Sequence, residues 1–144
     1  MLFGKRKRHV KRIMIVEDEP LVAFDNEVLL ADAGYEVVAT LDSYADAVAQ
    51  LDKEAVDLIV SDVTLSGDQD GIALAREARR RGVPVLFVTG RVPDNAADLV
   101  VGCLTKPYTG GTLKSALECV DRHLGGAVKI KLPKGLLLYP RSPD

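Results

Sequence analysis

The sequence has few cysteines, no long apolar run and no large excess of charge, and each of these absences excludes a class of protein. Its two cysteines, Cys103 and Cys119, lie far apart and form no C-x-x-C pair, which excludes a disulfide framework and a cysteine zinc site. We therefore expect a reducing compartment, the cytoplasm. A membrane span needs about 18 consecutive apolar residues, and no stretch approaches that length. The net charge of −2 predicts no general attraction to nucleic acids or membranes.

The first ten residues form a basic leader, with an unbroken basic run from Lys5 to Arg8. An export signal would continue with roughly 7–15 apolar residues. Here the apolar stretch runs only from Ile13 to Val16, and acidic residues follow it. We interpret residues 1–10 as a solvated leader before the first strand, with a docking patch for an acidic partner as the alternative.

Between residues 11 and 125, short β-branched runs alternate with helix-like stretches. The runs are almost continuously apolar, as expected for strands that are covered on both faces. This order predicts an α/β fold, a flavodoxin-like, doubly wound sheet of five parallel strands in the order 2-1-3-4-5, with helices on both faces. The expected strands are 13–16, 36–39, 58–60, 85–88 and 101–104, and the expected helices are 20–33, 44–51, 71–81, 94–99 and 112–124.

Local signals mark where several of these helices begin and end. Ser43 and Asp70 are expected N-caps, and Gly34 suits the left-handed residue that ends the first helix. Apolar side chains recur on one face of that helix: Leu21, Phe24, Val28 and Ala31.

Residues 126–144 lie outside the alternating pattern and are interpreted as a C-terminal extension. Apolar side chains at 128, 130 and 132 alternate with Lys129 and Lys131, which favours an extended segment. The extension is too short for a second domain with its own core, so we expect no DNA-binding domain after the first.

Polar residues follow four of the predicted strands directly. They are Glu17 and Asp18 after the first strand, Asp62 at the end of the third, Thr89 after the fourth and Lys106 after the fifth. The carboxyl ends of parallel strands share one edge of the sheet, where ligands bind. In the order 2-1-3-4-5 the first and third strands are neighbours, so the three carboxylates should lie together.

Three carboxylates in one pocket repel each other unless a cation lies between them, and hard oxygen ligands suit Mg²⁺. Lys106 would add a fixed positive charge and Thr89 a hydroxyl donor, and together these can hold a phosphoryl group. A carboxylate nucleophile that forms an aspartyl-phosphate is known enzyme chemistry. The set therefore indicates magnesium-dependent phosphorylation of an aspartate.

These residues, with their neighbours, resemble the receiver domains of two-component response regulators over residues 11–125. The resemblance depends on five segments: Val16-Glu17-Asp18-Glu19-Pro20, Asp62 after Leu58-Ile59-Val60-Ser61, Asp70-Gly71, Thr89-Gly90 and Lys106-Pro107. It implies a chain that catalyses only its own phosphoryl transfer and dephosphorylation, and a sensor histidine kinase or phosphotransfer protein as partner.

The resemblance also implies a role for each matching residue. Asp62 is the expected phosphoacceptor and also a metal ligand, Asp18 is a direct metal ligand, and Glu17 is a ligand that acts partly through water. The backbone carbonyl of Thr64 falls where the family takes its third protein ligand. Thr89 and Lys106 match the residues that contact the phosphoryl oxygens, and the peptide before Pro107 is usually cis in the family.

The sequence departs from the family in three ways. The stretch from Thr89 to Lys106 is shorter than usual, so the fourth helix should be abbreviated or remodelled. Cys103 stands where most members carry Tyr or Phe in the fifth strand. The run from Phe87 to Gly90 is similar to the Phe-Ala-Thr-Gly signature of the FAT GUY receivers of alphaproteobacterial stress signalling, although Val88 and Arg91 depart from it.

Four residues are expected to modulate the signal. In the family, the positions of Thr64 and Arg91 flank the path of the attacking water, so we expect both to influence the lifetime of the phosphate. The small Cys103 cannot reproduce the rotation of a strand aromatic, so residues 90–100 are the expected switch, with Tyr108 as a substitute aromatic in the alternative.

The function that this pattern favours is a single-domain response regulator that signals by protein contact or serves as a phosphate sink. A phosphatase of the haloacid-dehalogenase type would need a second Asp two residues after Asp62, where Thr64 stands. A non-phosphorylated interaction module on the same fold remains an alternative, and a homodimer remains open.

Overall fold

The structure, a computed structural model, describes residues 8–66 and 70–140. One sheet runs through the described residues, in the order β2-β1-β3-β4-β5-β6. Its strands are β1 (Arg12–Val16), β2 (Glu36–Leu41), β3 (Leu58–Ser61), β4 (Val85–Thr89), β5 (Gly102–Thr105) and β6 (Leu136–Leu138). The first five are parallel, which confirms the predicted order, and β6 adds an antiparallel edge strand that the prediction of five strands missed.

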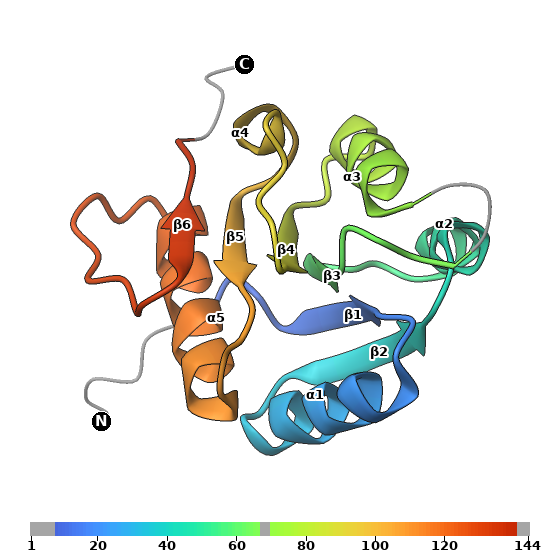
Figure 1. The fold of residues 1–144 in the computed structure, drawn as a ribbon, viewed down its shortest axis with the longest axis horizontal. Helices are drawn as coiled ribbons and strands as arrows, with labels where there is room; N and C mark the ends of the chain where they lie inside the picture. The colour runs from blue at the N-terminus through green and yellow to red at the C-terminus, as the bar shows by residue number, and fades with distance from the viewer. Residues whose placement is uncertain (1–7, 67–69, 141–144) are drawn as a thin grey trace.

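Helices cover both faces of this sheet (Figure 1). They are α1 (Pro20–Asp32), α2 (Tyr44–Lys53), α3 (Gly71–Arg80), α4 (Ala96–Leu99) and α5 (Gly110–Leu124). Helices α1 and α5 pack on one face, while α2, α3 and α4 lie on the other. The abbreviated fourth helix is confirmed, since α4 makes barely one turn. In the part of the chain that the structure describes, no helix is both long and apolar enough to cross a membrane.

The predicted helix signals act as expected. The Ser43 side chain accepts a hydrogen bond from the backbone N–H of Asp46, and Asp70 accepts from Ile72 and Ala73 at the start of α3. After α1, Gly34 adopts a φ of 97°, a left-handed conformation that costs glycine little. The caps at Ser43 and Asp70 fix loops on the edge of the sheet that carries the polar residues, whereas Gly34 lies at the opposite edge, before β2.

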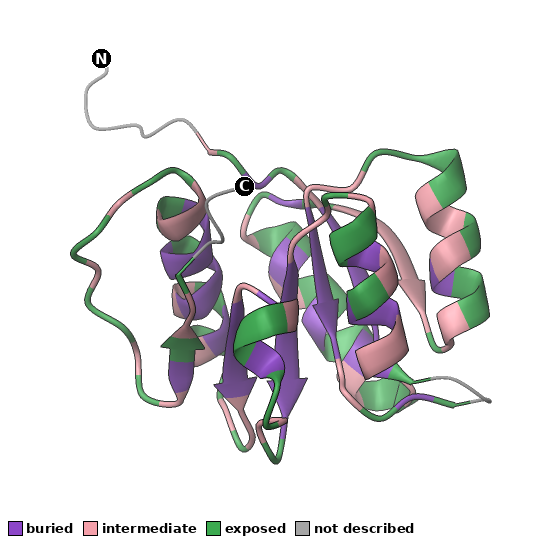
Figure 2. Cartoon of the chain, turned by 90° about the horizontal axis from the view of Figure 1, so that it is seen from above, coloured by how far each residue is buried: buried purple, intermediate pink, exposed green. Residues whose placement is uncertain are grey.

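The core forms two layers, one on each side of the buried strands (Figure 2). In β1, Ile13 and Ile15 pack toward α1 and α5, while Met14 and Val16 pack toward the helices of the other face. All four side chains are almost completely buried. Because both faces of each central strand are covered, the strands read as continuous apolar runs, as the sequence indicated.

The apolar face of α1 that the sequence singled out is turned to solvent. Leu21 is 80% exposed and Phe24 62%, whereas the buried side of α1 carries Ala23, Asn26 and Leu30. A repeat of apolar residues shows that they share a face, but it does not show which face meets the core.

The strand of the C-terminal extension does not lie where the alternating pattern at 128–132 predicted it. The described part of residues 126–135 contains neither helix nor strand, and β6 begins later, at Leu136. The predicted extended segment is therefore displaced toward the C-terminus. Much of the basic leader, through residue 7, lies outside the described residues, as do residues 67–69.

Candidate functional site

The carboxyl ends of four neighbouring strands bring the predicted polar residues to one edge of the sheet. They are Glu17 and Asp18 after β1, Asp62 after β3, Thr89 at the end of β4 and Lys106 after β5. Backbone hydrogen bonds fix this edge. The N–H of Asp62 donates to the carbonyl of Val16 at 3.0 Å, and the N–H of Lys106 donates to the carbonyl of Thr89 at 2.8 Å.

The three carboxylates form one cluster. Glu17, Asp18 and Asp62 each place a carboxylate oxygen within 4.8 Å of the others, and this is the group of potential metal ligands that the described residues contain. Glu17 is buried, while Asp18 and Asp62 are partly exposed. Burial raises the pKa of Glu17, the hydrogen bond from the backbone N–H of Glu19 lowers it, and the charge of Asp62 raises it again. The cluster therefore holds its negative charges at an energetic cost.

Lys106 reaches into this cluster from the β5–α5 loop. Its Nζ lies 2.9 Å from Asp62 Oδ2 and 4.0 Å from Glu17 Oε1. Burial lowers the pKa of Lys106, but the hydrogen bond and the charge of Asp62 outweigh it, and the net shift is upward. Lys106 is thus a fixed ammonium directed at one oxygen of Asp62.

The cluster fits a divalent cation. Three carboxylates against one ammonium leave two negative charges without a partner. A cavity of about 340 Å³ adjoins Glu17 and Asp18 on the β2 side, and Asp42 and Asp46 add carboxylates to its wall. Hard oxygen ligands around an open hollow suit Mg²⁺, which binds through few carboxylates and keeps several waters.

Thr89 is buried at the edge of this site, but its hydroxyl is engaged elsewhere. Its Oγ1 donates to the carbonyl of Arg91 at 2.9 Å and accepts from the backbone N–H of Arg91 at 3.2 Å. The hydroxyl thus ties β4 to the loop that leads to α4. Contact with a group on Asp62 would require the hydroxyl to leave Arg91.

The turn after β3 carries Thr64 next to the cluster. The backbone N–H of Thr64 donates to Asp62 Oδ1 at 3.3 Å, and its side chain is exposed. The turn is closed by a 2.7 Å hydrogen bond from the N–H of Gly71 to the carbonyl of Val63. Gly71 packs against the backbone at Asp62 so closely that a Cβ would overlap the Asp62 carbonyl oxygen.

The remaining expected switch residues lie on either side of the Lys106 loop. Cys103 is completely buried in β5. Tyr108 follows the Lys106–Pro107 peptide, which is cis, as the resemblance implied. The hydroxyl of Tyr108 accepts from the side-chain amide of Asn26 at 3.0 Å, which links the loop to α1.

Sequence reasoning missed two contacts around this loop. Asn26 is a buried amide on α1, and its polar character in an otherwise apolar buried stripe was the signal that could have identified it. Gly135, at the turn before β6, accepts from the N–H of Thr105 at 2.9 Å. The apolar run from Leu136 to Leu138, which follows the turn residues Pro133 to Gly135, could have indicated a strand there.

Comparison with known proteins agrees with this geometry. The family model of the response regulator receiver domain matches residues 13–118. The chain is 33% identical over 133 residues to the sensory transduction protein RegX3 of Mycobacterium tuberculosis, covering 87% of this chain and 56% of that protein. It is 40% identical over 122 residues to the transcriptional regulatory protein TcrA of the same species, covering 78% and 46%. It thus spans about half the length of these relatives.

A solved structure shows the same fold. The response regulator receiver protein from Sinorhizobium medicae superimposes with a TM-score of 0.64 at 29% identity, over 76% of this chain and 92% of that one. Neither this match nor the two relatives named above carries the FAT GUY name, so that subfamily stays a prediction. Receiver domains are phosphoacceptor modules of two-component signal transduction and not classical enzymes. With a family match over most of its length, the chain belongs to the response regulator receiver domain family.

Proposed function

We propose that the chain is a single-domain response regulator that accepts a phosphoryl group on Asp62 in a magnesium-dependent reaction. The donor is a phosphohistidine of a sensor histidine kinase or phosphotransfer protein. The phosphorylated chain signals by protein contact or acts as a phosphate sink. The observation that carries this proposal is the joint placement of three carboxylates and the Lys106 ammonium, 2.9 Å from Asp62, at one edge of the sheet.

In the proposed reaction, a carboxylate oxygen of Asp62 attacks phosphorus while the P–N bond of the phosphohistidine breaks. The imidazole nitrogen leaves with the electron pair and takes up a proton. Lys106 holds an oxygen of the transferred group, and the Thr89 hydroxyl leaves Arg91 to donate to another. Glu17, Asp18, Asp62 and the carbonyl of Thr64 would hold Mg²⁺, which would supply positive charge to the phosphoryl oxygens. Positioning and charge therefore account for most of the catalysis.

The exposed apolar face of α1 supports a protein donor. Leu21 and Phe24 lie in the first turns of α1, which begins directly after the acidic segment that carries Glu17 and Asp18. Exposed apolar patches of this kind mark protein contact sites. A partner bound to this face would lie beside the cluster and could present its phosphohistidine to Asp62.

The intact mass of the protein after incubation with Mg²⁺ and acetyl phosphate tests this function. We expect one added phosphoryl group, and none when the Mg²⁺ is removed with a chelator. An unchanged mass under both conditions would contradict the proposal and favour an interaction module that is not phosphorylated.

We expect Asp18→Ala to weaken Mg²⁺ binding strongly while leaving the metal-free fold as stable as the wild type, or more stable. The variant removes a proposed ligand, but without metal it also relieves repulsion among carboxylates within 4.8 Å of each other. Calorimetric titration with Mg²⁺ and a thermal melt in chelator measure the two effects. A large loss of metal-free stability would show that Asp18 is mainly structural.

Phosphorylation should also change hydrogen exchange in residues 90–100. The Thr89 hydroxyl now holds Arg91 through two hydrogen bonds, so its movement to a phosphoryl group would release this loop. The loop holds only the short α4 and so offers little resistance to rearrangement. Exchange with and without a phosphoryl mimic is the measurement. Protection that changes only around Tyr108 and α5 would show that another element responds.

A further inference from the structure

The C-terminal strand holds β5 along its whole length (Figure 1). At one end the N–H of Thr105 donates to the carbonyl of Gly135 at 2.9 Å, and the Thr105 hydroxyl contacts the same oxygen at 3.3 Å. At the other end the N–H of Tyr139 donates to the carbonyl of Val101 at 2.9 Å. Thr105 is the residue before Lys106, so this pairing extends to the edge of the acidic cluster.

The close packing of β6 against β5 depends on Gly102 of β5, which has no side chain. A Cβ on Gly102 would lie 2.5 Å from the carbonyl oxygen of Leu137 and 2.9 Å from a methyl group of Leu138. The first of these is a backbone atom and cannot move aside without shifting β6. Leu136, at the start of the strand, is almost completely buried. The pair β5–β6 is therefore closely fitted.

Tyr139 anchors the end of the strand. Its hydroxyl contacts Cys103 Sγ at 3.6 Å, and its carbonyl oxygen lies 2.7 Å from Nε2 of His123 on α5. Burial, together with the contact to Cys103, raises the pKa of Tyr139 to about 12. Tyr139 packs in the same apolar cluster as Cys103.

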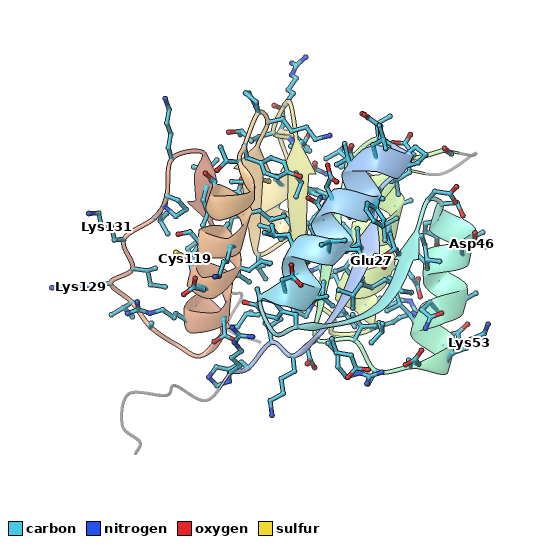
Figure 3. The ribbon with its side chains drawn as sticks, turned by 90° about the horizontal axis from the view of Figure 1, so that it is seen from below. Glu27, Asp46, Lys53, Cys119, Lys129 and Lys131 are labelled. Atoms are coloured by element: carbon cyan, nitrogen blue, oxygen red, sulfur yellow. The ribbon has the colours of Figure 1, made fainter. Side chains whose placement is uncertain are left out.

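The segment that leads to this strand packs on the body through Ile130, which contacts the apolar cluster between the sheet, α1 and α5. Figure 3 shows residues 126–135 passing outside α5, with the side chains of Lys129 and Lys131 directed away from the protein. The Sγ of Cys119 on α5 contacts the carbonyl of Lys131 at 3.5 Å. The backbone pairing of the extension with β5 runs from Gly135 to Tyr139.

We propose that the segment Gly135–Tyr139 is a positioning element for phosphoryl transfer, which holds Lys106 in place through Thr105 and is anchored by Tyr139 against Cys103. This inference rests on the proposed role of Lys106 in phosphorylation. Without β6, the four-residue β5 would be the edge of the sheet, and edge strands open more readily than interior ones. The preceding strand would then give Lys106 less support on the side opposite to β4.

A second contact fixes the loop from its other side. Tyr108, two residues after Lys106, bonds to Asn26 of α1. Lys106 thus lies between two restraints, one from α1 and one from the C-terminal turn. Catalytic groups need such support, because a displacement of about 1 Å at the reacting centre can cost about 100-fold in rate.

Two variants of the 144-residue chain test the proposal. Gly102→Ala places a Cβ against Leu137, and Tyr139→Ala removes the anchor from a partly exposed site outside the five parallel strands. We expect both to slow phosphorylation by acetyl phosphate about ten- to a hundredfold. The matched control is Val128→Ala in the same extension. The Val128 side chain is 92% exposed, so this variant should behave as the wild type.

The Mg²⁺ affinity separates positioning from general damage. Lys106 competes with a cation for Asp62, so a looser Lys106 should leave Mg²⁺ binding unchanged or tighter while phosphorylation slows. Phosphorylation and Mg²⁺ affinity that fall together would overturn the proposal, since they would indicate a distorted cluster. If the wild type takes up no phosphate, the proposed function fails, yet tighter Mg²⁺ binding in both variants would still support the positioning of Lys106.

A double-mutant cycle gives the second criterion. If β6 acts through Lys106, adding Gly102→Ala or Tyr139→Ala to Lys106→Ala should slow phosphorylation no further. Rate losses that multiply in the double variants would show that β6 acts independently of Lys106 and would overturn the inference. Circular dichroism and a thermal melt on each variant identify any that are unfolded. If Gly102→Ala does not fold, the result for Tyr139→Ala alone decides whether the proposal stands.

Discussion

Asp62→Asn and Asp62→Ala should both abolish phosphorylation by acetyl phosphate, even with saturating Mg²⁺. Asp62 is the carboxylate that Lys106 contacts at 2.9 Å, and it follows β3, the neighbour of β1, after which Glu17 and Asp18 stand. Asn retains the shape of the side chain, but its amide is a poor nucleophile and cannot form an acyl phosphate. The effect should therefore be a complete loss of the added mass and not a slower rate.

The neighbouring carboxylates should not replace Asp62. Glu17 is buried and its nearest approach to Lys106 is 4.0 Å, so it lacks the close ammonium that would hold the transferred group. The matched control is Asp32→Asn, which replaces an exposed carboxylate at the end of α1. This variant should be phosphorylated to the same extent as the wild type. Modification of Asp62→Ala at the wild-type level would show that another residue accepts the phosphoryl group.

The central parallel strands could be predicted because each is covered on both faces. Burial on both sides makes each strand a short, almost continuously apolar run, as in Leu58–Ile59–Val60, and such runs are visible without any structure. The position of the site followed from the same pattern. Once the strands are parallel, the residues after them share an edge, and Glu17, Asp18 and Asp62 indeed form one cluster.

The sixth strand could not be predicted with the same ease, because its stability comes from a distant segment. Residues Leu136 to Leu138 carry no alternation, and the strand is only three residues long. It forms because Gly102, more than thirty residues earlier, offers no Cβ to block it. Alternation at 128–132 was the stronger local signal, yet that stretch finds no neighbouring strand.

The orientation of side chains was also beyond the sequence. The place of Thr89 directly after the predicted strand 85–88 indicated that it would lie at the site. It could not show that the Thr89 hydroxyl bonds to the backbone of Arg91. In the same way, periodicity grouped Leu21 with Phe24 without showing that both face solvent. Both features depend on what packs against the residue, and that is decided by the tertiary structure.

Gly71→Ala should destabilise the fold strongly, and more than Gly102→Ala. A Cβ at this position would overlap the carbonyl oxygen of Asp62 and lie 2.7 Å from the carbonyl oxygen of Val63 and 2.8 Å from its Cα. All three are backbone atoms, so no side chain can rotate away. Forcing extra atoms into a packed site costs about 1–3 kcal/mol, and rigid neighbours favour the upper end. The midpoint of urea unfolding without metal measures the loss.

Gly111→Ala is the matched control, with an expected effect of the opposite sign. Gly111 lies in the first turn of α5, where a Cβ would meet only the Thr109 hydroxyl oxygen at 3.7 Å, an ordinary contact. Alanine restricts the unfolded chain more than glycine, which should stabilise the protein by up to about 1 kcal/mol. Equal midpoints for Gly71→Ala and the wild type would show that the turn can move aside.

The position of Gly71 makes the same substitution a test of the site. The hydrogen bond from its N–H to the carbonyl of Val63 closes the turn that carries Asp62 at one end and the proposed ligand Thr64 within it. To accept a Cβ, that turn must move away from α3, and both oxygen ligands would move with it. We therefore expect Gly71→Ala to lose Mg²⁺ affinity as well as stability, which calorimetric titration below the unfolding midpoint would detect. Wild-type affinity in a destabilised variant would show that the carboxylate of Asp62 is held by β3 alone and not by the turn.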